Sequence, residues 1–262
     1  MAKRSFANKR VLLTGAGSGI GWYLASELVR AGAYVVVTGR RAERLQQLRR
    51  AFGNPQKRLI ALPGDISEPQ HRRELVATTI EQLGGIDIVI NNAGIGAIGN
   101  FEDATPERLR RIFEVDFFAA VELTRLTLPH LKKGVQPAVC IVNSVLGHRG
   151  VPHKSEYCAA KFALRGWSES LRVELQPAGI DVVAVSPSTT SSEFFDSLLD
   201  TAKGVRNRSL GVQSAERVAD SVLRALKGRK RDMILTPGGK ALVWLSRLAP
   251  RLTDQLLLRY AM

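Results

Sequence analysis

The sequence predicts an α/β fold in which a parallel sheet is covered by helices on both faces. Short apolar runs alternate along the chain with longer stretches whose apolar residues recur at helical spacing. The short runs are apolar at consecutive positions, which is typical of strands buried on both faces. A glycine-rich turn, residues 14–21, joins the first run to the first helical stretch. Together these observations predict a doubly wound, three-layer sandwich with about seven parallel strands.

The predicted elements alternate between strand and helix along the whole chain. The first strand is predicted at 11–13, and Leu24 and Leu28 mark the helix after the turn. Further strands are predicted at 34–38, 59–62, 86–90, 138–142, 181–185 and 233–235. The other helices are predicted at 42–52, 69–83, 106–131, 156–176 and 215–226. In such a sheet, the loops at the carboxyl ends of the strands form the ligand-binding edge.

Composition favours one domain and argues against a nucleic-acid partner. The chain has 262 residues, of which 45% are hydrophobic, and it shows no linker, repeat or low-complexity run. A single domain over residues 1–262 is therefore expected. The formal charge of +14 is spread over several predicted helices, so we interpret the basic residues as solvated helix faces. Because no basic stripe is interleaved with aromatic residues, nucleic-acid binding is not expected.

Cysteine and histidine usage predicts neither a disulfide framework nor a metal site. The two cysteines, Cys140 and Cys158, and the four histidines show no metal-ligand spacing. The first ten residues carry charge but lead into no apolar segment with a cleavage site, so no secretory signal is predicted. We expect a cytoplasmic protein in a reducing compartment, with peripheral contact at the membrane surface as the alternative.

The glycine turn is suited to hold a phosphate group. Thr14, Gly15, Gly19 and Gly21 follow the spacing TGxxxGxG. Glycine lets the backbone adopt positive φ and approach a ligand closely, and the N–H groups at a helix start attract anions. The GxGxxG fingerprint of dinucleotide-binding folds fits no register here. Taken alone, the observed spacing also fits a purely structural turn.

Tyr157 and Lys161 lie four residues apart in a predicted helix and therefore project from one face. Tyrosine is a poor acid near neutral pH, but a neighbouring ammonium group favours its anion and lowers its pKa. A tyrosine in this position can exchange a proton with a carbonyl or alcohol oxygen. Ser144, at the end of a predicted strand, would donate a hydrogen bond to the same oxygen. Singly, each of these residues is also common in ordinary helices and turns.

Four motifs occur together and in order: TGAGSGIG at 14–21, NNAG at 91–94, Ser144, and YCAAK from Tyr157 to Lys161. With this combination the chain resembles the classical short-chain dehydrogenases/reductases, from about Lys9 to Pro237. The resemblance implies a Rossmann fold and an oxidoreductase that interconverts a carbonyl group and a secondary alcohol. It also implies that Tyr157 is the general acid/base, that Ser144 polarises the substrate oxygen, and that Lys161 lowers the pKa of Tyr157 and binds the nicotinamide ribose.

The resemblance also assigns cofactor-binding residues to four loops. The glycine turn would hold the pyrophosphate, the loop after the third strand would contact the adenine, and NNAG would line the adenosine side. The loop after the sixth strand would cover the nicotinamide carboxamide, with Ser192 as the alternative to Thr190 for a hydroxyl contact. The residues are Gly15, Ser18, Gly19, Ile20, Gly21, Asp65, Ile66, Asn92, Ala93, Gly94, Tyr157, Lys161, Pro187 and Thr190.

Cofactor preference is predicted from the end of the second strand. A site for NAD would place a carboxylate there to accept hydrogen bonds from the ribose hydroxyls. This chain instead has Gly39 followed by Arg40 and Arg41, whose guanidinium groups suit a 2′-phosphate. We therefore expect NADP(H) as the preferred cofactor and NAD(H) as the alternative. The other interpretation is that both arginines only solvate the next helix.

Two positions depart from the family pattern. Asp116 stands where the family has an asparagine that holds a water in the proton relay to the lysine, and we expect it to keep a catalytic relay or structural role. Ser188 follows Pro187 where the family has a glycine, and a serine restricts the backbone more. These departures leave a second hypothesis open, namely a dinucleotide-binding sensor or scaffold with little turnover.

Residues 188–213 are expected to form a substrate lid. Apolar residues of the lid and of the loop after the fifth strand suggest a pocket for a lipophilic carbonyl or alcohol substrate, although ordinary lid packing would use the same residues. They are Phe194, Phe195, Leu198, Val145, Leu146 and Val151. The family pairs its subunits through two long helices, here 107–131 and 157–175, so a homodimer or homotetramer is expected.

The C-terminal tail, residues 238–262, has leucines at helical spacing with arginines between them and Pro250 as an interruption. Its charges forbid a transmembrane span. We expect the tail to dock on this chain or on a second subunit, with peripheral binding to an anionic membrane as the second interpretation.

Overall fold

A seven-stranded parallel sheet forms the centre of the computed structural model, which describes residues 3–52, 58–191, 193, 198–199 and 212–261. All six strand pairings in this sheet are parallel, as the sequence predicts. The strand order is β3 (Leu59–Pro63), β2 (Tyr34–Gly39), β1 (Arg10–Thr14), β4 (Ile88–Asn91), β5 (Ala138–Val142), β6 (Asp181–Ser186) and β9 (Asp232–Ile234). The order reverses between β1 and β4, so their carboxyl ends form the switch point where ligands bind in such sheets.

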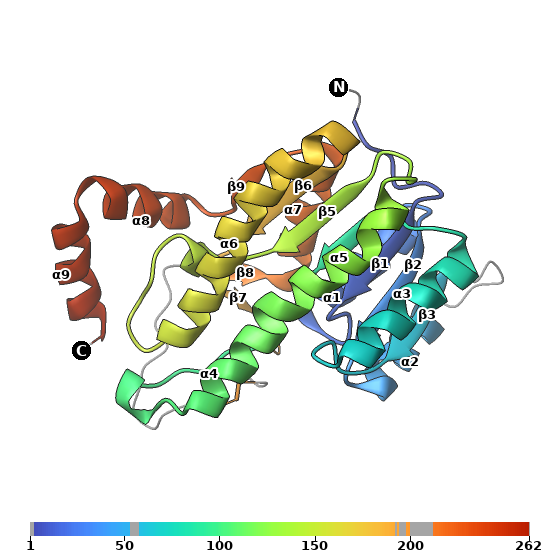
Figure 1. Ribbon diagram of the computed structural model, residues 1–262. Helices are drawn as coiled ribbons and strands as arrows, with labels where there is room; N and C mark the ends of the chain where they lie inside the picture. Colours follow the sequence, from blue (N-terminus) through green and yellow to red (C-terminus); the bar gives the residue numbers. More distant parts are fainter. Residues whose placement is uncertain (1–2, 53–57, 192, 194–197, 200–211, 262) are drawn as a thin grey trace.

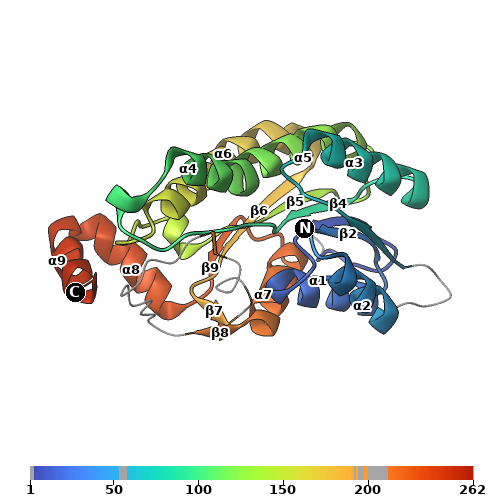
Figure 2. The ribbon, with the colours of Figure 1, turned by 90° about the horizontal axis from the view of Figure 1, so that it is seen from below.

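Helices cover both faces of the sheet and give three layers (Figures 1 and 2). One face carries α1 (Gly19–Arg30), α2 (Ala42–Phe52) and α7 (Ala215–Lys227). The other carries α3 (Pro69–Leu83), α4 (Pro106–Phe113), α5 (Ala119–Leu131) and α6 (Ser155–Leu175). The predicted Rossmann-type sandwich is therefore confirmed.

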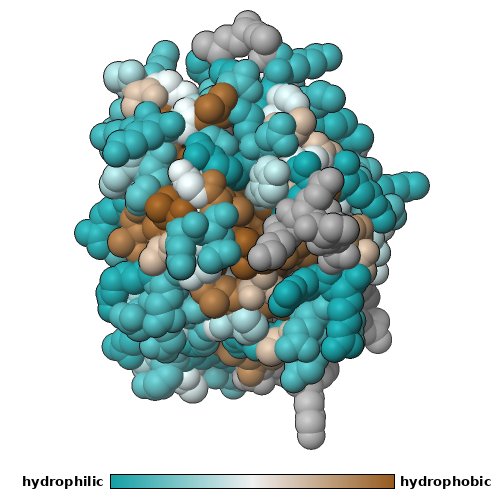
Figure 3. Space-filling model, turned by 90° about the vertical axis from the view of Figure 1, so that its right-hand side faces the viewer, coloured by the Kyte–Doolittle hydropathy of each residue, from teal (hydrophilic) through white to brown (hydrophobic). Residues whose placement is uncertain are grey.

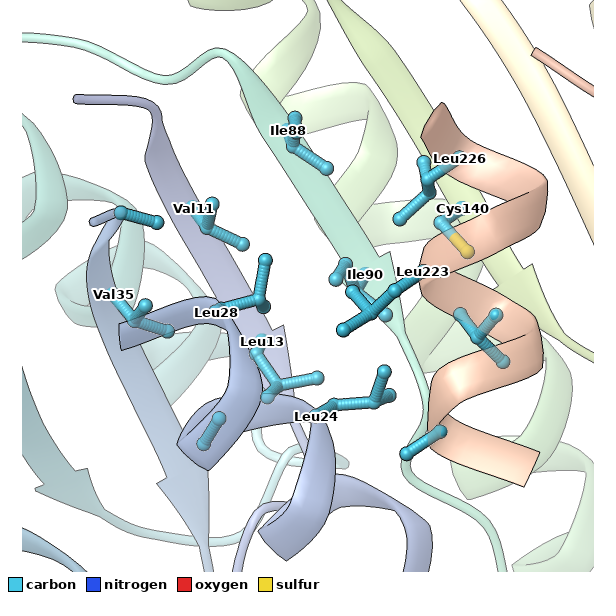
Figure 4. Packing of buried hydrophobic residues seen from close by; sticks show 14 of the residues in the cluster. Val11, Leu13, Leu24, Leu28, Val35, Ile88, Ile90, Cys140, Leu223 and Leu226 are labelled. Carbon is cyan, nitrogen blue, oxygen red and sulfur yellow. The ribbon is translucent and has the colours of Figure 1, made fainter. Parts of the chain in front are cut away.

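Successive strand residues fill the two cores alternately, because side chains on a strand point to opposite faces. Val11 and Leu13 of β1 join the core under α1 and α7, whereas Leu12 joins the core under α3 to α6. Figure 4 shows the first of these cores, in which two leucines from each helix pack on the sheet: Leu24, Leu28, Leu223 and Leu226 against Val11, Leu13, Ile88 and Ile90.

The helix predicted at 106–131 is interrupted by one π-helical turn, Glu114–Phe118, between α4 and α5. Asp116 lies in this turn and is buried. π-Turns inside helices are frequent at functional sites. Short 3₁₀ turns occur at Phe101–Asp103, Val145–Gly147 and Gln176–Ala178.

Two short strands, β7 (Thr190–Ser191) and β8 (Gln213–Ser214), pair in a separate ribbon that the sequence did not predict. They flank the expected lid at 188–213, most of which, with Ser192, Phe194 and Phe195, lies outside the described residues.

The β3 edge of the sheet carries partly buried apolar residues, including Ile60 and Leu62. Figure 3 views the molecule from this side and shows apolar side chains gathered in a band across an otherwise hydrophilic face.

The tail forms two helices, α8 (Pro237–Leu248) and α9 (Pro250–Ala261), which extend beyond the sheet at one end of the molecule (Figures 1 and 2). The break falls at Pro250 as predicted, since proline lacks a backbone N–H for a continuous helix. Within the described part of the chain, no helix is long and apolar enough to cross a bilayer.

Candidate active site

The glycine turn opens α1 and lies directly against the loop after β4. Gly15 and Gly19 have φ values of +72° and +51°, which L side chains rarely adopt. A Cβ on Gly15 would lie 2.8 Å from the Ala93 Cα, so the two loops meet backbone to backbone. Ser18 is the N-cap of α1 but makes no side-chain capping bond, which leaves the first turn of the helix without that cap. The turn is therefore built for close approach of an anion.

Thr14 and Asn92 hold these two loops together. The Asn92 side-chain amide donates to the carbonyl oxygens of Thr14, at 2.9 Å, and Gly15, at 3.1 Å. In return the Thr14 hydroxyl accepts from the N–H groups of Asn92 and Ala93, each at 3.0 Å. The NNAG motif thus fixes the position of the glycine turn.

Two arginines that follow β2, one before α2 and one in its first turn, converge on the glycine turn. Arg41 and Arg44 approach the Gly17 carbonyl oxygen at 3.3 and 3.4 Å, and both pair with Glu193, at 2.5 and 2.9 Å. Arg44 also lies over the Trp22 ring, 5.0 Å from its centroid. The sequence analysis missed Arg44, although it follows Arg41 by three residues, a spacing that brings side chains together on a helix. Arg40 is exposed and takes no part in this cluster in the described contacts.

Asp65 and Ile66 lie where the predicted adenine contact would fall, after β3. The Asp65 carboxylate accepts from the Ser67 N–H at 2.9 Å and pairs with Arg111. Burial raises the pKa of Asp65, but the hydrogen bonds from Ser67 and Arg111 outweigh it and hold the pKa below its usual value. The carboxylate is therefore a fixed, charged acceptor.

Ser144, Tyr157, Lys161 and Asp116 form one cluster at the carboxyl edge of β4 and β5. Ser144 follows β5, and its hydroxyl accepts from the Leu146 N–H at 3.1 Å and is hydrogen-bonded to Tyr157. The Lys161 ammonium lies 5.4 Å from the centroid of the Tyr157 ring and 3.0 Å from the Asp116 carboxylate. The other Asp116 oxygen accepts from the Ile95 N–H at 2.7 Å.

Lys161 lowers the pKa of Tyr157, as expected, but other groups raise it more, so the net pKa is raised. Burial raises it most, and Asp116 raises it further because a nearby carboxylate disfavours a phenolate. Lys161 and the Ser144 hydrogen bond lower it, so the predicted effect of the lysine has the right sign. Burial and the Asp116 charge outweigh the lysine.

Lys161 and Asp116 are a buried ion pair. Burial lowers the pKa of Lys161, but Asp116 and Tyr157 outweigh it, so that the pKa is raised and the ammonium stays charged. Burial raises the pKa of Asp116, and Lys161 opposes this shift. A Cβ on Gly94 would lie 3.2 Å from the Asp116 carboxylate and 3.4 Å from the Lys161 nitrogen, so NNAG also borders the pair.

The start of α6, which carries Tyr157, is fixed to α4 by a buried ion pair that the sequence analysis missed. Arg108 binds Glu156 through two hydrogen bonds, of 2.8 and 3.2 Å, and both side chains are almost fully buried. No sequence spacing relates these residues, because they lie 48 positions apart.

The loop after β6 contains the predicted Pro187 and Thr190. Pro187 accepts from the Val145 N–H at 2.9 Å, and the Thr190 hydroxyl donates to the Ser188 carbonyl at 3.1 Å. Ser188 has no positive φ, so it carries none of the backbone strain that a required glycine would imply. Its hydroxyl lies 2.5 Å from that of Thr236, the N-cap of α8.

Together these residues could hold an elongated anionic cofactor along one edge of the sheet. The glycine turn offers backbone close approach, Arg41 and Arg44 offer positive charge at one end, and Lys161 offers it at the other. Tyr157 and Ser144 supply hydroxyl groups able to bind and protonate an oxygen. A doubly wound sheet with this cluster at the carboxyl ends of its strands is the arrangement expected of an α/β oxidoreductase.

Comparison with known proteins agrees with an oxidoreductase of this fold. A short chain dehydrogenase family model matches residues 9–203. The uncharacterized oxidoreductase YxnA of Bacillus subtilis is 34% identical over 253 residues, which cover 94% of this chain and 70% of that protein. The ketoacyl reductase HetN of Nostoc is 32% identical over 231 residues, covering 88% and 79%. The crystal structure of a short chain dehydrogenase from Burkholderia cenocepacia in complex with NADP is 29% identical, has a TM-score of 0.79, and covers 90% of this chain and 100% of its own.

The chain belongs to the short-chain dehydrogenase/reductase family. It is an oxidoreductase that acts on CH–OH groups.

Proposed function

We propose that the protein is an NADP(H)-dependent oxidoreductase that interconverts a carbonyl group and a secondary alcohol. The observation that carries this proposal is the cluster of Ser144, Tyr157, Lys161 and Asp116, which lies at the same sheet edge as the glycine turn.

In this mechanism Tyr157 is the general acid/base. Its hydroxyl donates a proton to the carbonyl oxygen in reduction, and its phenolate accepts one from the alcohol in oxidation, while the Ser144 hydroxyl donates a hydrogen bond to the same oxygen. The Lys161 ammonium stabilises the phenolate, and Asp116 holds the lysine charged and in place. A nicotinamide bound beside this cluster would supply or accept the hydride.

Preference for NADP(H) over NAD(H) is proposed from Arg41 and Arg44, because two guanidinium groups at the end of β2 suit a 2′-phosphate. Solved relatives hold NADP in one case and NADH in another, so the preference is argued from the two arginines. The remaining contacts proposed for the cofactor are those of the glycine turn, of Asp65 and Ile66, of NNAG, and of Pro187 and Thr190.

A lipophilic substrate is proposed from the apolar residues beside Ser144, namely Val145, Leu146 and Val151, with 188–213 as the lid. The name of the ketoacyl reductase relative fits such a substrate. A homodimer or homotetramer is proposed through the outer helices, since Leu109, Phe118 and Val173 are exposed on α4, the π-turn and α6. A cytoplasmic location is also retained as a proposal.

The test is a panel of carbonyl and alcohol substrates with NADPH or NADP and with NADH or NAD. Turnover should be faster with the phosphorylated cofactor, and Tyr157→Phe should lose about 10²- to 10⁴-fold in kcat, the usual contribution of general acid–base catalysis. Cofactor binding by Tyr157→Phe, measured by fluorescence, is the control. If the wild type binds dinucleotide but turns over no substrate, the sensor hypothesis replaces this one.

A further inference from the structure

The C-terminal helices carry an apolar stripe that faces solvent. Trp244 and Leu248 lie four residues apart on α8, and Leu252 and Leu256 lie four residues apart on α9, so each pair shares one side of its own helix. With Leu258, these side chains are between 45% and 80% exposed. Large apolar side chains at this exposure are an interaction surface.

The opposite side of the same helices is anchored to the body of the protein. Val243 and Thr253 are buried, and the Thr236 hydroxyl caps α8 by accepting from the Gly239 N–H at 3.0 Å. Asp254 on α9 pairs with Arg149, which follows the loop after β5. The apolar stripe is thus exposed on helices that are fixed to the body of the protein. The tail therefore docks on this chain through its buried residues, whereas the apolar stripe stays exposed.

A cleft of about 620 Å³ continues the apolar surface from α9 to the start of α6. Its lining includes Leu257 and Leu258 on one side and Val151, Pro152 and Phe162 on the other. Helices α8 and α9 stand at the end of the molecule in both ribbon views, where a flat surface can reach them (Figures 1 and 2).

The charges around the stripe select the partner. From residue 237 onward the chain has four basic residues and one acidic residue. Lys240, Arg247, Arg251 and Arg259 are all exposed, whereas the single acid, Asp254, is paired with Arg149. A second copy would bring the same cationic face against this one and would also carry a charge of +14. An anionic surface is the complementary partner.

We propose that α8 and α9 form an interfacial anchor that lies flat on an anionic lipid bilayer. The stripe enters the boundary between headgroups and acyl chains, and the arginines bind lipid phosphates. Arg247 lies over the Trp244 ring, 5.8 Å from its centroid, and a tryptophan beside a cation is typical of the headgroup level. The enzyme would then work at a membrane surface without a spanning segment.

The experiment is co-flotation of the full-length protein with vesicles of phosphatidylcholine alone or mixed with phosphatidylglycerol. Wild type should float with the mixed vesicles, and raised salt should weaken binding. Leu248→Ser with Leu252→Ser should bind at least about tenfold more weakly, since two leucines lose apolar burial. Arg247→Gln with Arg251→Gln and Arg259→Gln should bind the mixed vesicles as weakly as phosphatidylcholine alone.

Two control variants distinguish binding through this anchor from non-specific apolar adsorption and from an effect of net charge. Val135→Ser removes a similarly exposed apolar side chain from the loop after α5, and Arg49→Gln with Arg50→Gln removes exposed charge from α2; both should float like wild type. Failure of the wild type to float, or equal loss in the controls, overturns the proposal. So does light scattering that shows the leucine variant, still folded by circular dichroism, losing a subunit partner while vesicle binding is unchanged. The readout needs no turnover and is independent of the proposed activity.

Discussion

The carboxylate of Asp116 lies 3.0 Å from the ammonium of Lys161, and both side chains are buried at the catalytic edge. The negative charge raises the pKa of both Lys161 and Tyr157. The pair arises because the π-helical turn Glu114–Phe118 places Asp116 inside the sandwich.

Asp116→Asn should therefore lower the pKa of Tyr157, because the charge that disfavours the phenolate is gone. Alcohol oxidation needs the phenolate as base, so the rising limb of its pH–rate profile should move to lower pH. The measurement is kcat for alcohol oxidation across the alkaline range. Asp103→Asn, on the exposed 3₁₀ turn, is the matched control. An unchanged profile would mean that the Asp116 charge has no part in proton transfer.

The local pattern of the sequence predicted the regular elements well. The helix 42–52 and the strand 138–142 have the predicted bounds, because an amphipathic repeat and a buried apolar run are properties of neighbouring residues. The meeting of Ser144, Tyr157 and Lys161 could also be predicted, since strand ends of a parallel sheet share one edge.

What the sequence did not predict depends on contacts between distant residues. Arg4 is fully buried, where it donates to the Leu226 carbonyl at 2.6 Å and pairs with Asp181, although the sequence suggested only a charged terminus. The raised pKa of Tyr157 is another case, because burial is set by the whole fold. Glu193 reaches Arg41 across 152 positions, which no local pattern reveals.

The ion pair between Arg108 and Glu156 should be needed for stability. Both groups are buried, so Arg108→Met or Glu156→Leu alone leaves an uncompensated buried charge and should lower the free energy of unfolding by about 3–5 kcal/mol. The double variant Arg108→Met with Glu156→Leu should lose much less than the sum, because neither charge remains. Urea unfolding of the four proteins gives the coupling. Additive losses would show that the pair makes no coupled contribution.

Arg41 and Arg44 should decide between NADPH and NADH. Each arginine changed to glutamine should weaken NADPH binding by roughly tenfold, which corresponds to one lost charge-assisted hydrogen bond, and should leave NADH binding almost unchanged. Fluorescence titration with both cofactors measures this. Arg40→Gln is the matched comparison, since Arg40 lies outside the arginine cluster. If only Arg40→Gln lowers the preference for NADPH over NADH, the expectation for Arg40 holds and the assignment to Arg44 is wrong.

Glu193 should compete with the 2′-phosphate, because its carboxylate pairs with both arginines. Glu193→Gln removes that charge and should tighten NADPH binding while leaving NADH unaffected. The pKa of Glu193 is lowered, mainly by its hydrogen bond from Arg41, so the competition persists at neutral pH. Equal effects on both cofactors would instead indicate a general change in the loop.

The glycines of the turn should differ sharply in their tolerance of alanine, although they lie within seven residues of one another. A Cβ on Gly21 would lie 2.1 Å from the Gly15 carbonyl oxygen. Relieving this clash would require a shift of the backbone, which destabilises the fold. On Gly17 the nearest atom would be the Arg41 side chain at 3.9 Å, an ordinary contact. Gly21→Ala should therefore lose cofactor binding or fold poorly, whereas Gly17→Ala should keep the wild-type melting temperature and bind NADPH. Thermal unfolding without NADPH measures the stability of each variant, and the increase in melting temperature with NADPH measures its cofactor binding. Comparable losses in the two variants would show that the turn needs glycine at position 17 for flexibility, and that steric fit alone does not explain the TGxxxGxG spacing.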